Sequence, residues 1–364
     1  MKRIVLTGGG TAGHITPNIA LIPKLKKVGL SIHYIGLRGG MEEGLIAQQK
    51  VPFHGITGGK LRRYLDIKNF TDVFKIGAGF FEALSVMQRV KPDIVFSKGG
   101  FVSTPVVWAA HFCRVPVVAH ESDCTVGLAN RLSIPFVQKI CYTFPETAGQ
   151  LPQGKGVFTG LPIRESLLHG DAARGRRLCD FNGKKPVIVA TGGSQGARFI
   201  NVLLRGCLDS LLPQFDICHI CGEGNLSEKL KDTPGYRQFE YVQGDLPDIF
   251  TMADIVVSRA GATSIFELLA LKKPSLLIPY ALNASRGDQI INAKSFQKQG
   301  FSEVLDQSAA TPKQFLSLID ALYQNRAFYI EKMEKSTVKN GLEGVFNVIC
   351  ETAKIFHKNS IAKK

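Results

Sequence analysis

The sequence predicts an α/β protein made of two doubly wound, parallel-sheet domains that face each other across a cleft. The first observation is a repeated phrase: IVLTGGGTAG at 4–13 and IVATGGSQGA at 188–197 each run from a short apolar segment into a glycine-rich turn. Each copy is typical of a buried strand, a turn that needs glycine, and a helix whose first N–H groups can hold an anion. The second observation is the length, because 364 residues allow two domains that each bury a core.

The first half of the chain alternates between apolar, strand-like runs and helix-like runs. Strands separated by helices of this length indicate βαβ crossovers and a parallel sheet. We expect a first domain over 1–160, with 156–164 containing its last strand and a hinge. The expected strands are 3–7, 31–36, 51–56, 93–97, 115–120 and 139–142, and the expected helices are 14–28, 41–48, 70–89, 105–113 and 126–132.

The second half repeats this plan, which predicts a second domain over 161–339. The closing stretch 328–356 is mostly helical, and a helix at 340–357 could pack back onto the first domain. The expected strands are 186–191, 215–221, 239–242, 254–258, 275–279 and 300–304, and the expected helices are 197–212, 246–251, 263–271, 289–299 and 312–324.

The composition favours a polyanionic partner, because the formal net charge is +15. Candidates are nucleic acid, an acidic membrane face and phosphate-bearing ligands. No nucleic-acid-binding motif accompanies the charge, so we expect no nucleic acid partner. The uncharged segment 4–23 is interrupted by glycines and prolines, which excludes a signal peptide or membrane span there. Eight cysteines without a pairing rhythm indicate a reducing compartment, by default the cytoplasm.

Glycine turns mark where the ligands of such sheets bind, beyond the carboxyl ends of the strands. The turn from Gly8 to His14 is similar to a dinucleotide fingerprint, but no acid ends the second strand, where an NAD site needs one. His14 stands at the start of the helix. It is either a helix-capping imidazole or a general base, since imidazole titrates near neutral pH and the positive helix end favours its neutral form.

Two further groups follow neighbouring strands of the first domain. The turn SKGGFVSTP at 97–105, with Gly99 and Gly100, provides another anion-ready helix start on the same sheet edge, which favours diphosphate binding over simple turn chemistry. Glu121, in AHESD at 119–123, either orients His14 or a substrate hydroxyl, or caps the helix that follows.

In the second half, four polar groups indicate a nucleotide site. Ser194 lies where its hydroxyl would meet a phosphate, and Arg164, at the hinge, is either a diphosphate fork or a surface arginine. Glu267, flanked by apolar residues, could accept both ribose hydroxyls, and Gln289 begins a helix that faces the same cleft. No Asp-x-Asp and no metal-ligand spacing occur. We therefore expect no metal and no cofactor, with helix N-termini and Arg164 carrying the leaving-group charge.

The segment 70–84 is rich in aromatic residues and follows a run of basic residues. It is either an ordinary amphipathic crossover helix or a membrane-surface patch, in which apolar side chains enter the interface and basic ones meet acidic lipid. The patch would use the apolar Phe74, Phe80, Phe81 and Leu84 and the basic Lys60, Arg62, Arg63, Lys68 and Lys75.

Taken together, the chain resembles, from end to end, the MurG family of peptidoglycan synthesis. The motifs that carry the resemblance are GGTAGH at 9–14, KGGF at 98–101, HE at 120–121, GGSQGA at 192–197, SRAGA at 258–262 with Glu267, and DQ at 288–289 with NA at 292–293. The family implies a GT-B fold of two Rossmann-like domains. It also implies inverting transfer of GlcNAc from UDP-GlcNAc to the 4-hydroxyl of the muramyl sugar on undecaprenyl diphosphate.

The resemblance also implies roles for individual residues. His14 would be the base, with Glu121 as a second catalytic residue, and the backbone near Gln243 would read uracil. The acceptor diphosphate would lie on Gly9, Gly10, Gly99 and Gly100. UDP-GlcNAc would be bound by Thr11, Ala12, Gly13, Asp123, Arg164, Ser194, Gln243, Ala262, Thr263, Ser264, Glu267 and Gln289.

The sequence departs from the family pattern twice: Ser122-Asp123 stands where the family usually has Gln-Asn after His-Glu, and Leu161 stands where the hinge usually has Asn. The first departure puts an acid where an amide is expected to touch the transferred sugar. The family implies work at the cytoplasmic face of the cell membrane as a peripheral protein, with other cell-wall synthesis proteins as partners. Two other functions stay open: transfer to a different lipid acceptor, and a non-catalytic scaffold that binds sugar nucleotide.

Overall fold

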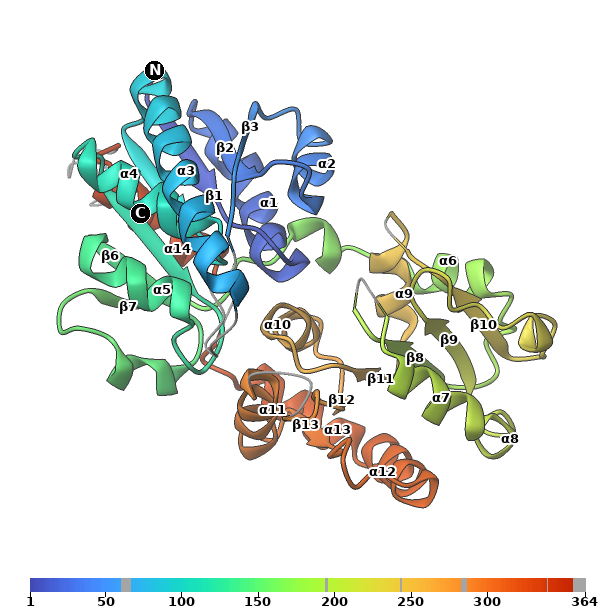
Figure 1. Ribbon diagram of the computed structural model, residues 1–364. Helices are drawn as coiled ribbons and strands as arrows, with labels where there is room; N and C mark the ends of the chain where they lie inside the picture. Colours follow the sequence, from blue (N-terminus) through green and yellow to red (C-terminus); the bar gives the residue numbers. More distant parts are fainter. Residues whose placement is uncertain (60–66, 194–195, 243, 283–286, 339, 356–364) are drawn as a thin grey trace. The chain divides into compact units, whose positions relative to one another are not determined.

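The chain folds into two units, each built on its own parallel sheet (Figure 1). The computed structural model describes residues 1–364 except 60–66, 194–195, 243, 283–286, 339 and 356–364. Unit 1 comprises Met1–Arg164 and Val338–Lys364, and unit 2 comprises Glu165–Thr337. The first unit thus runs to Arg164 rather than to residue 160, and it includes the end of the chain.

The sheet of unit 1 has the order β3-β2-β1-β4-β5-β6-β7, with every pairing parallel. Its order reverses between β1 and β4, which is the switch point where doubly wound sheets bind ligands. The strands are β1 Arg3–Thr7, β2 Ser31–Leu37, β3 Phe53–Ile56, β4 Ile94–Ser97, β5 Val117–Glu121, β6 Lys139–Tyr142 and β7 Gly156–Phe158. The helices are α1 Ala12–Lys27, α2 Met41–Ala47, α3 Ile67–Val90, α4 Ser103–Phe112, α5 Leu128–Ser133 and α14 Leu342–Thr352, with 3₁₀ turns η1 Ile134–Phe136 and η2 Pro145–Gln150.

Side chains of β1 alternate between two cores, one on each face of the sheet. Ile4 and Leu6 pack in the cluster that contains residues of α1 and α14, whereas Val5 packs in the cluster formed with α3 and α4. A strand that is apolar on both faces must be covered on both faces, which accounts for the unbroken apolar run in the sequence.

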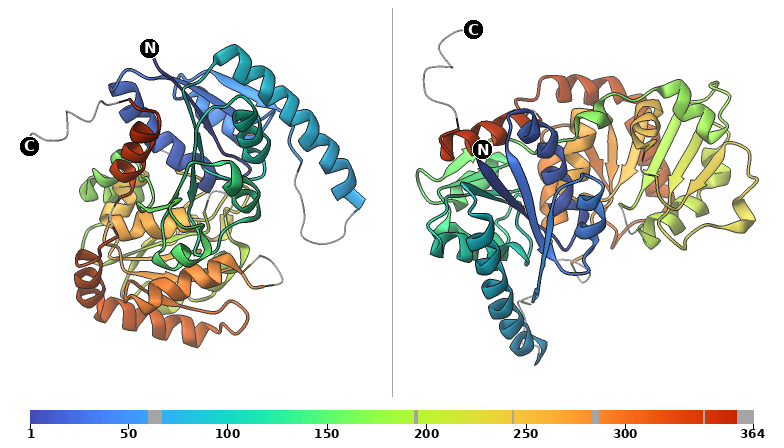
Figure 2. Two further views of the ribbon diagram at one scale, coloured as in Figure 1. Left: turned by 90° about the vertical axis from the view of Figure 1, so that its left-hand side faces the viewer. Right: turned by 90° about the horizontal axis from the view of Figure 1, so that it is seen from above.

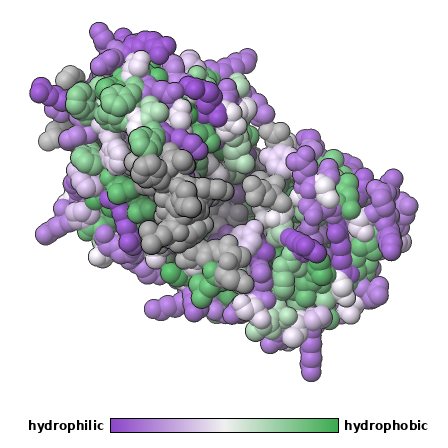
Figure 3. All heavy atoms as spheres, in the orientation of Figure 1, coloured by the Kyte–Doolittle hydropathy of each residue, from purple (hydrophilic) through white to green (hydrophobic). Residues whose placement is uncertain are grey.

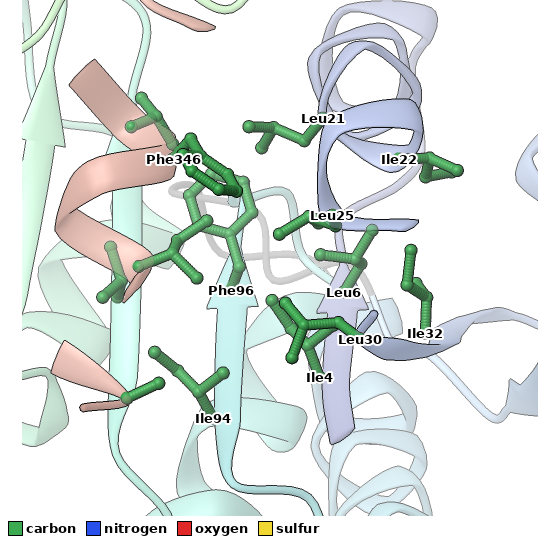
Figure 4. Close-up of a cluster of buried hydrophobic side chains, with 14 of the residues drawn as sticks. Ile4, Leu6, Leu21, Ile22, Leu25, Leu30, Ile32, Ile94, Phe96 and Phe346 are labelled. Atoms are coloured by element: carbon green, nitrogen blue, oxygen red, sulfur yellow. The ribbon is translucent and has the colours of Figure 1, made fainter. Parts of the chain in front are cut away.

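Helix α14 belongs to the core of unit 1, although it follows all of unit 2 in the chain. Phe346 lies beside Leu21 and Leu25 of α1 and Phe96 of β4 (Figure 4). The residues before α14 are hydrogen-bonded to the end of the segment Met1–Arg164, since Gly341 N–H donates to Leu161 C=O at 2.8 Å. Unit 1 is therefore closed by residues from both ends of the sequence.

The sheet of unit 2 has the order β10-β9-β8-β11-β12-β13, again all parallel, with the reversal between β8 and β11. Its strands are β8 Val187–Thr191, β9 Asp216–Ile220, β10 Tyr236–Phe239, β11 Ile255–Ser258, β12 Ser275–Leu277 and β13 Ser302–Val304. Its helices are α6 Ala172–Cys179, α7 Arg198–Gly206, α8 Leu208–Leu211, α9 Leu246–Met252, α10 Ala262–Ala270, α11 Asp288–Lys298, α12 Pro312–Gln324 and α13 Arg326–Glu334, with 3₁₀ turns η3 Glu165–Leu168 and η4 Glu228–Leu230.

Two local predictions for unit 2 were wrong, and one helix was not predicted. The strand expected at 239–242 ends at Phe239, because pairing with β9 places the buried Tyr236 opposite Ile217, while Tyr241 is exposed. The helix expected over 197–212 is broken after Gly206, a residue that weakens helices. Helix α6 was not anticipated, because only two of its residues, Gly175 and Cys179, are buried.

Helix α3 extends beyond the sheet of its own unit at its N-terminal end, as both views of Figure 2 show. Within the described parts of the chain, no helix has the length and apolar character needed to cross a membrane.

Candidate functional site

Two glycine turns meet at the carboxyl edge of the unit 1 sheet, where β1 and β4 end. Gly10, Gly99 and Gly100 have φ near +83°, a conformation that favours glycine. A Cβ on Gly100 would lie 2.4 Å from Gly9 O and 3.3 Å from His14 Nδ1. The turns are therefore packed backbone to backbone, with the His14 ring beside them.

His14 lies in the first turn of α1 and is half-buried. Its Nδ1 is 2.9 Å from Thr11 Oγ1. When Nδ1–H donates to that hydroxyl, Nε2 is the unprotonated nitrogen and can accept a proton. The sequence left open a cap or a base; the hydrogen bond to Thr11 orients the ring and suits either role.

Buried polar side chains attach the start of α1, which carries His14, to the end of β1 and the turn that follows it. Asn18 Nδ2 donates to Thr7 O at 3.2 Å, and Tyr34 OH donates to Gly8 O at 2.6 Å. Burial raises the pKa of Tyr34, so this hydroxyl keeps its proton. The buried Glu42, which the sequence reasoning missed, accepts from Leu37 N at 2.9 Å and lies where any Cβ on Gly9 would be.

Glu121 ends β5 and organises the loop that follows it. Its Oε1 accepts from Asp123 N at 3.0 Å, and its Oε2 accepts from Gly127 N at 2.9 Å and from Asn130 Nδ2 at 2.8 Å. Of the two roles that the sequence allowed, these contacts favour support of the loop and of the start of α5. The loop places Asp123, the acid in place of the expected amide, at the same sheet edge as His14.

Lys98 is a buried cation at this edge that the sequence analysis passed over. Its side chain is 1% exposed, and its Nζ donates to Ser122 Oγ. The neighbouring His120 is also buried; its Nε2 contacts Gly160 O at 3.0 Å, and both burial and the charge of Lys98 hold its pKa well below the usual value. The signal in the sequence was a lysine directly after an apolar strand.

The carboxyl edge of the unit 2 sheet carries the second copy of the glycine turn. Gly193 and Gly196 have positive φ, and a Cβ on Gly196 would lie 2.2 Å from Cys221 O. Asn201 of α7 donates to the same carbonyl at 2.8 Å. The start of α7 is thus fastened to the end of β9. Ser194, at the centre of the turn, lies outside the described residues, as does Gln243.

A second turn of unit 2 leads from β11 into α10. Ala262 is the first residue of α10, and the half-buried Thr263 and Ser264 follow it in the first turn. Glu267 is 8% exposed; it lies four residues after Thr263, so both belong to one helix face. The carboxylate of Glu267 is therefore placed close to the start of α10.

Two side-chain amides from α11 lie beside this turn, and an arginine packs against it. Gln289 Oε1 accepts from Tyr280 N at 3.3 Å, and Asn292 Nδ2 donates to Ala260 O at 3.3 Å. Arg259 is buried, donates to Ile278 O at 2.9 Å and stacks over the Tyr280 ring at 4.0 Å. These contacts attach the turn to α11 and to the segment that follows β12.

Arg164 is the last residue of unit 1 and is half-buried. The preceding Ile163 donates its N–H to Asn340 Oδ1 at 3.0 Å, so the segment before Arg164 is fixed to the segment that leads into α14. This arrangement limits the positions that Arg164 can take.

Aromatic side chains form an exposed surface on α3 and α4 of unit 1. Phe74, Phe81 and Phe112 are 67%, 68% and 70% exposed, and the ring of Phe80 contacts those of Phe81 and Phe112. The sequence analysis missed Phe112, which joins from a different helix. Figure 3 shows hydrophobic side chains at the surface of unit 1 among hydrophilic ones.

The basic residues expected around these rings are described only in part. Lys75 is exposed and pairs with Asp72 at 3.4 Å. Leu84 is half-buried. Lys60, Arg62, Arg63 and the side chain of Lys68 lie outside the described residues.

Across all the described ranges, no three His, Cys, Asp or Glu side chains are grouped so that they could hold a metal ion.

Comparisons with known proteins match both units. The model of the glycosyltransferase family 28 N-terminal domain matches residues 4–142, and that of the C-terminal domain matches residues 187–345. The chain is 54% identical to the UDP-N-acetylglucosamine–N-acetylmuramyl-(pentapeptide) pyrophosphoryl-undecaprenol N-acetylglucosamine transferase of Clostridium kluyveri, over 96% of this chain and 99% of that protein. It is 52% identical to the protein of the same name from Clostridium tetani, over 96% and 97%.

Among solved structures, the chain is similar to the crystal structure of Acinetobacter baumannii MurG, with 25% identity and a TM-score of 0.76 over 96% of this chain and all of that one. The motif-based resemblance and the predicted fold class are both confirmed by these matches.

Proposed function

The chain belongs to glycosyltransferase family 28, and from that premise we propose that it transfers N-acetylglucosamine from UDP-N-acetylglucosamine to the muramyl sugar of a muramyl-pentapeptide linked to pyrophosphoryl-undecaprenol. The names of its relatives describe this transfer, which is a lipid-linked step of peptidoglycan synthesis. The observation that carries the proposal is the identity of 54%, which extends over both units and therefore over both candidate binding edges.

The acceptor binds to unit 1. The backbone of Gly9, Gly10, Gly99 and Gly100 and the start of α1 hold its diphosphate, because N–H groups at a helix start attract anions. His14 then acts as general base through Nε2 and takes the proton from the sugar 4-hydroxyl. The hydroxyl oxygen forms a bond to the anomeric carbon of GlcNAc as the bond from that carbon to UDP breaks, which inverts the configuration.

The donor binds mainly to unit 2. Glu267 accepts hydrogen bonds from the ribose hydroxyls, and Gln289 with the turn at Ala262, Thr263 and Ser264 completes the nucleotide and sugar site. The start of α7 and Arg164 offset the charge that develops on the departing diphosphate. Thr11, Ala12, Gly13 and Asp123 from unit 1 line the transferred sugar, and Ser194 and Gln243 complete the set.

The exposed aromatic surface on α3 and α4 binds the anionic membrane that holds the acceptor. Phe74, Phe81 and Phe112 enter the interface, with Phe80 and Leu84 behind them, while Lys75 and the basic residues at 60–68 meet acidic headgroups. The protein works as a peripheral protein at the cytoplasmic face, where UDP-sugars are available, beside other cell-wall synthesis proteins.

The test is transfer of radiolabelled GlcNAc to a panel of lipid acceptors in detergent. We expect label in the muramyl-pentapeptide diphospholipid and none in a diacylglycerol acceptor. Label in a different lipid would instead support a transferase with another acceptor. Binding of UDP-GlcNAc without transfer to any lipid would support the non-catalytic scaffold and overturn the proposal.

A further inference from the structure

Lys98 is a buried lysine whose ammonium group has few partners. Its side chain is 1% exposed, and Nζ can donate three hydrogen bonds. Across the part of the chain that the structure describes, the one acceptor found within hydrogen-bond distance of Nζ is Ser122 Oγ. Buried cations are rare in proteins unless they are paired, so a lysine in this position needs a reason.

The groups around Lys98 come from both neighbouring strands. From β5 and its loop, His120, Glu121 and Asp123 contribute titratable groups, and the two carboxylates favour the charged ammonium. From the side of β1 and α1, a Cβ on Gly8 would lie 3.0 Å from Lys98 Cβ and 3.1 Å from the neutral amide of Asn18. Burial is the stronger influence, and it lowers the pKa of Lys98 to about 8.

The hydrogen bond from Lys98 joins two loops at the carboxyl edge of the unit 1 sheet. Lys98 directly precedes the turn at Gly99 and Gly100, which packs against His14. Ser122 lies in the loop that is folded around the Glu121 carboxylate through Asp123 N and Gly127 N. A shift of Ser122 would therefore move Asp123 relative to the turn beside His14.

We propose that Lys98 is a positioning residue for the transfer reaction: held by Ser122, it fixes the loop after β5 against the glycine turn beside His14, and its charge compensates that of Asp123. The inference rests on the proposed function, because transfer is its main readout. It also accounts for an acid at residue 123, since a carboxylate there is favoured when a buried ammonium lies close by.

A double-mutant cycle tests the charge compensation. Lys98→Met keeps the length of the side chain and removes a positive charge that favours the Asp123 carboxylate. We expect kcat to fall at least ~10-fold, more than KM for either substrate rises. In the double variant with Asp123→Asn, both charges are absent, and we expect kcat to recover at least ~3-fold relative to Lys98→Met alone. Losses that simply multiply, or a wild-type kcat in Lys98→Met, would overturn the proposal.

The pH dependence of kcat gives a readout that a merely structural role would not move. In the wild type, kcat should fall as pH rises through about 8, because Lys98 loses its proton there. In Asp123→Asn that fall should begin at lower pH, since one of the two carboxylates that raise the pKa of Lys98 is gone while Glu121 remains. An unchanged alkaline limb in Asp123→Asn would contradict the assignment.

Thermal unfolding separates this inference from the proposed function. The folded-state pKa of Lys98 lies below the unfolded value, so the stability of the wild type relative to Lys98→Met should rise between pH 8 and 10.5. The matched control is Lys273→Met in unit 2, a lysine that donates to Thr251 O and Ala253 O. It should lower the melting temperature and leave the pH profile of kcat as in the wild type. A wild-type chain without transfer activity but with this stability pattern would contradict the function alone.

Discussion

The two glycine turns of this protein share a sequence and a backbone role but differ in what surrounds them. In unit 1, the turn after β1 lies beside His14, and the neighbouring strand ends bring Lys98, His120 and Glu121 to the same edge. In unit 2, the turn after β8 is fastened by the amide of Asn201, and the neighbouring turn is held by Arg259, Gln289 and Asn292.

From this comparison we infer that the repeated turn provides a place for phosphate, whereas residues at the ends of the other strands of each sheet decide the chemistry. Unit 1 has groups that can hold or move a proton at its edge. The described part of the unit 2 edge has mainly hydrogen-bonding groups and one buried carboxylate, Glu267. We therefore assign proton transfer to unit 1 and recognition of the nucleotide to unit 2, and the variants below test this division.

The largest effect should come from His14→Ala in unit 1. We expect kcat to fall at least ~100-fold, because a positioned general base contributes that much, while the affinity for UDP-GlcNAc stays nearly the same. Steady-state kinetics and equilibrium binding measure the two quantities. The control is His169→Ala, an exposed histidine of unit 2, which should leave both unchanged. A turnover like that of the wild type would remove His14 from the role of base.

The second largest effect should come from the exposed aromatic surface of unit 1, for which we assign no counterpart in unit 2. Combined Phe74→Ser, Phe81→Ser and Phe112→Ser changes should weaken binding to phosphatidylglycerol vesicles at least ~30-fold, because three rings no longer enter the interface. Vesicle sedimentation measures it. A matched variant of unit 2, with Val202, Leu226 and Phe328 changed to Ser, should bind vesicles normally. Equal losses in both variants would show that the surface is not specific.

A smaller effect is expected for Glu267→Gln in unit 2. Loss of charge-assisted hydrogen bonds to the ribose should raise KM for UDP-GlcNAc about 10-fold and leave kcat within about 2-fold, the opposite split to that of His14→Ala. Glu334→Gln, which removes an exposed carboxylate of the same unit, is the control. If kcat fell and KM did not, the assignment of Glu267 to the nucleotide would be wrong.

The smallest effect concerns the stability of unit 2. Burial lowers the pKa of His219 to about 3, and its ring bonds Tyr236 OH and Asn201 Oδ1 at 2.7 and 2.9 Å. Since the folded-state pKa is depressed, this contribution to stability is present above pH 6.5 and is lost as pH falls. Between pH 7.5 and 6, the loss should be about 1 kcal/mol.

The variant His219→Gln does not titrate, so denaturant unfolding of the two proteins at both pH values isolates the contribution. The variant should be less stable at pH 7.5, and the gap to the wild type should narrow at pH 6. A constant gap would show that His219 is not held neutral by the fold.

Most of the fold was predictable because its signals are local. Apolar runs such as 4–7 and 188–190 must be buried strands, and the glycines after them mark the turns, so the order of strands and helices followed from the sequence. The prediction of two parallel-sheet domains is confirmed. One error arose where strand pairing decides the result: β10 ends at Phe239 because β9 sets its register, which no local pattern reveals.

The family, the two sheets and the glycine turns could be predicted from the sequence, because each depends on residues that are neighbours in the chain. Other contacts became visible only in the folded chain: Phe346 completes the core of unit 1, Phe112 joins Phe80 and Phe81, and Lys98 donates to Ser122. These pairs are far apart in sequence, and their contacts exist only after the helices and strands have packed. Burial then sets the charge states of side chains at the carboxyl edge of the unit 1 sheet, since the pKa of a group such as Lys98 depends on the atoms that exclude water from it.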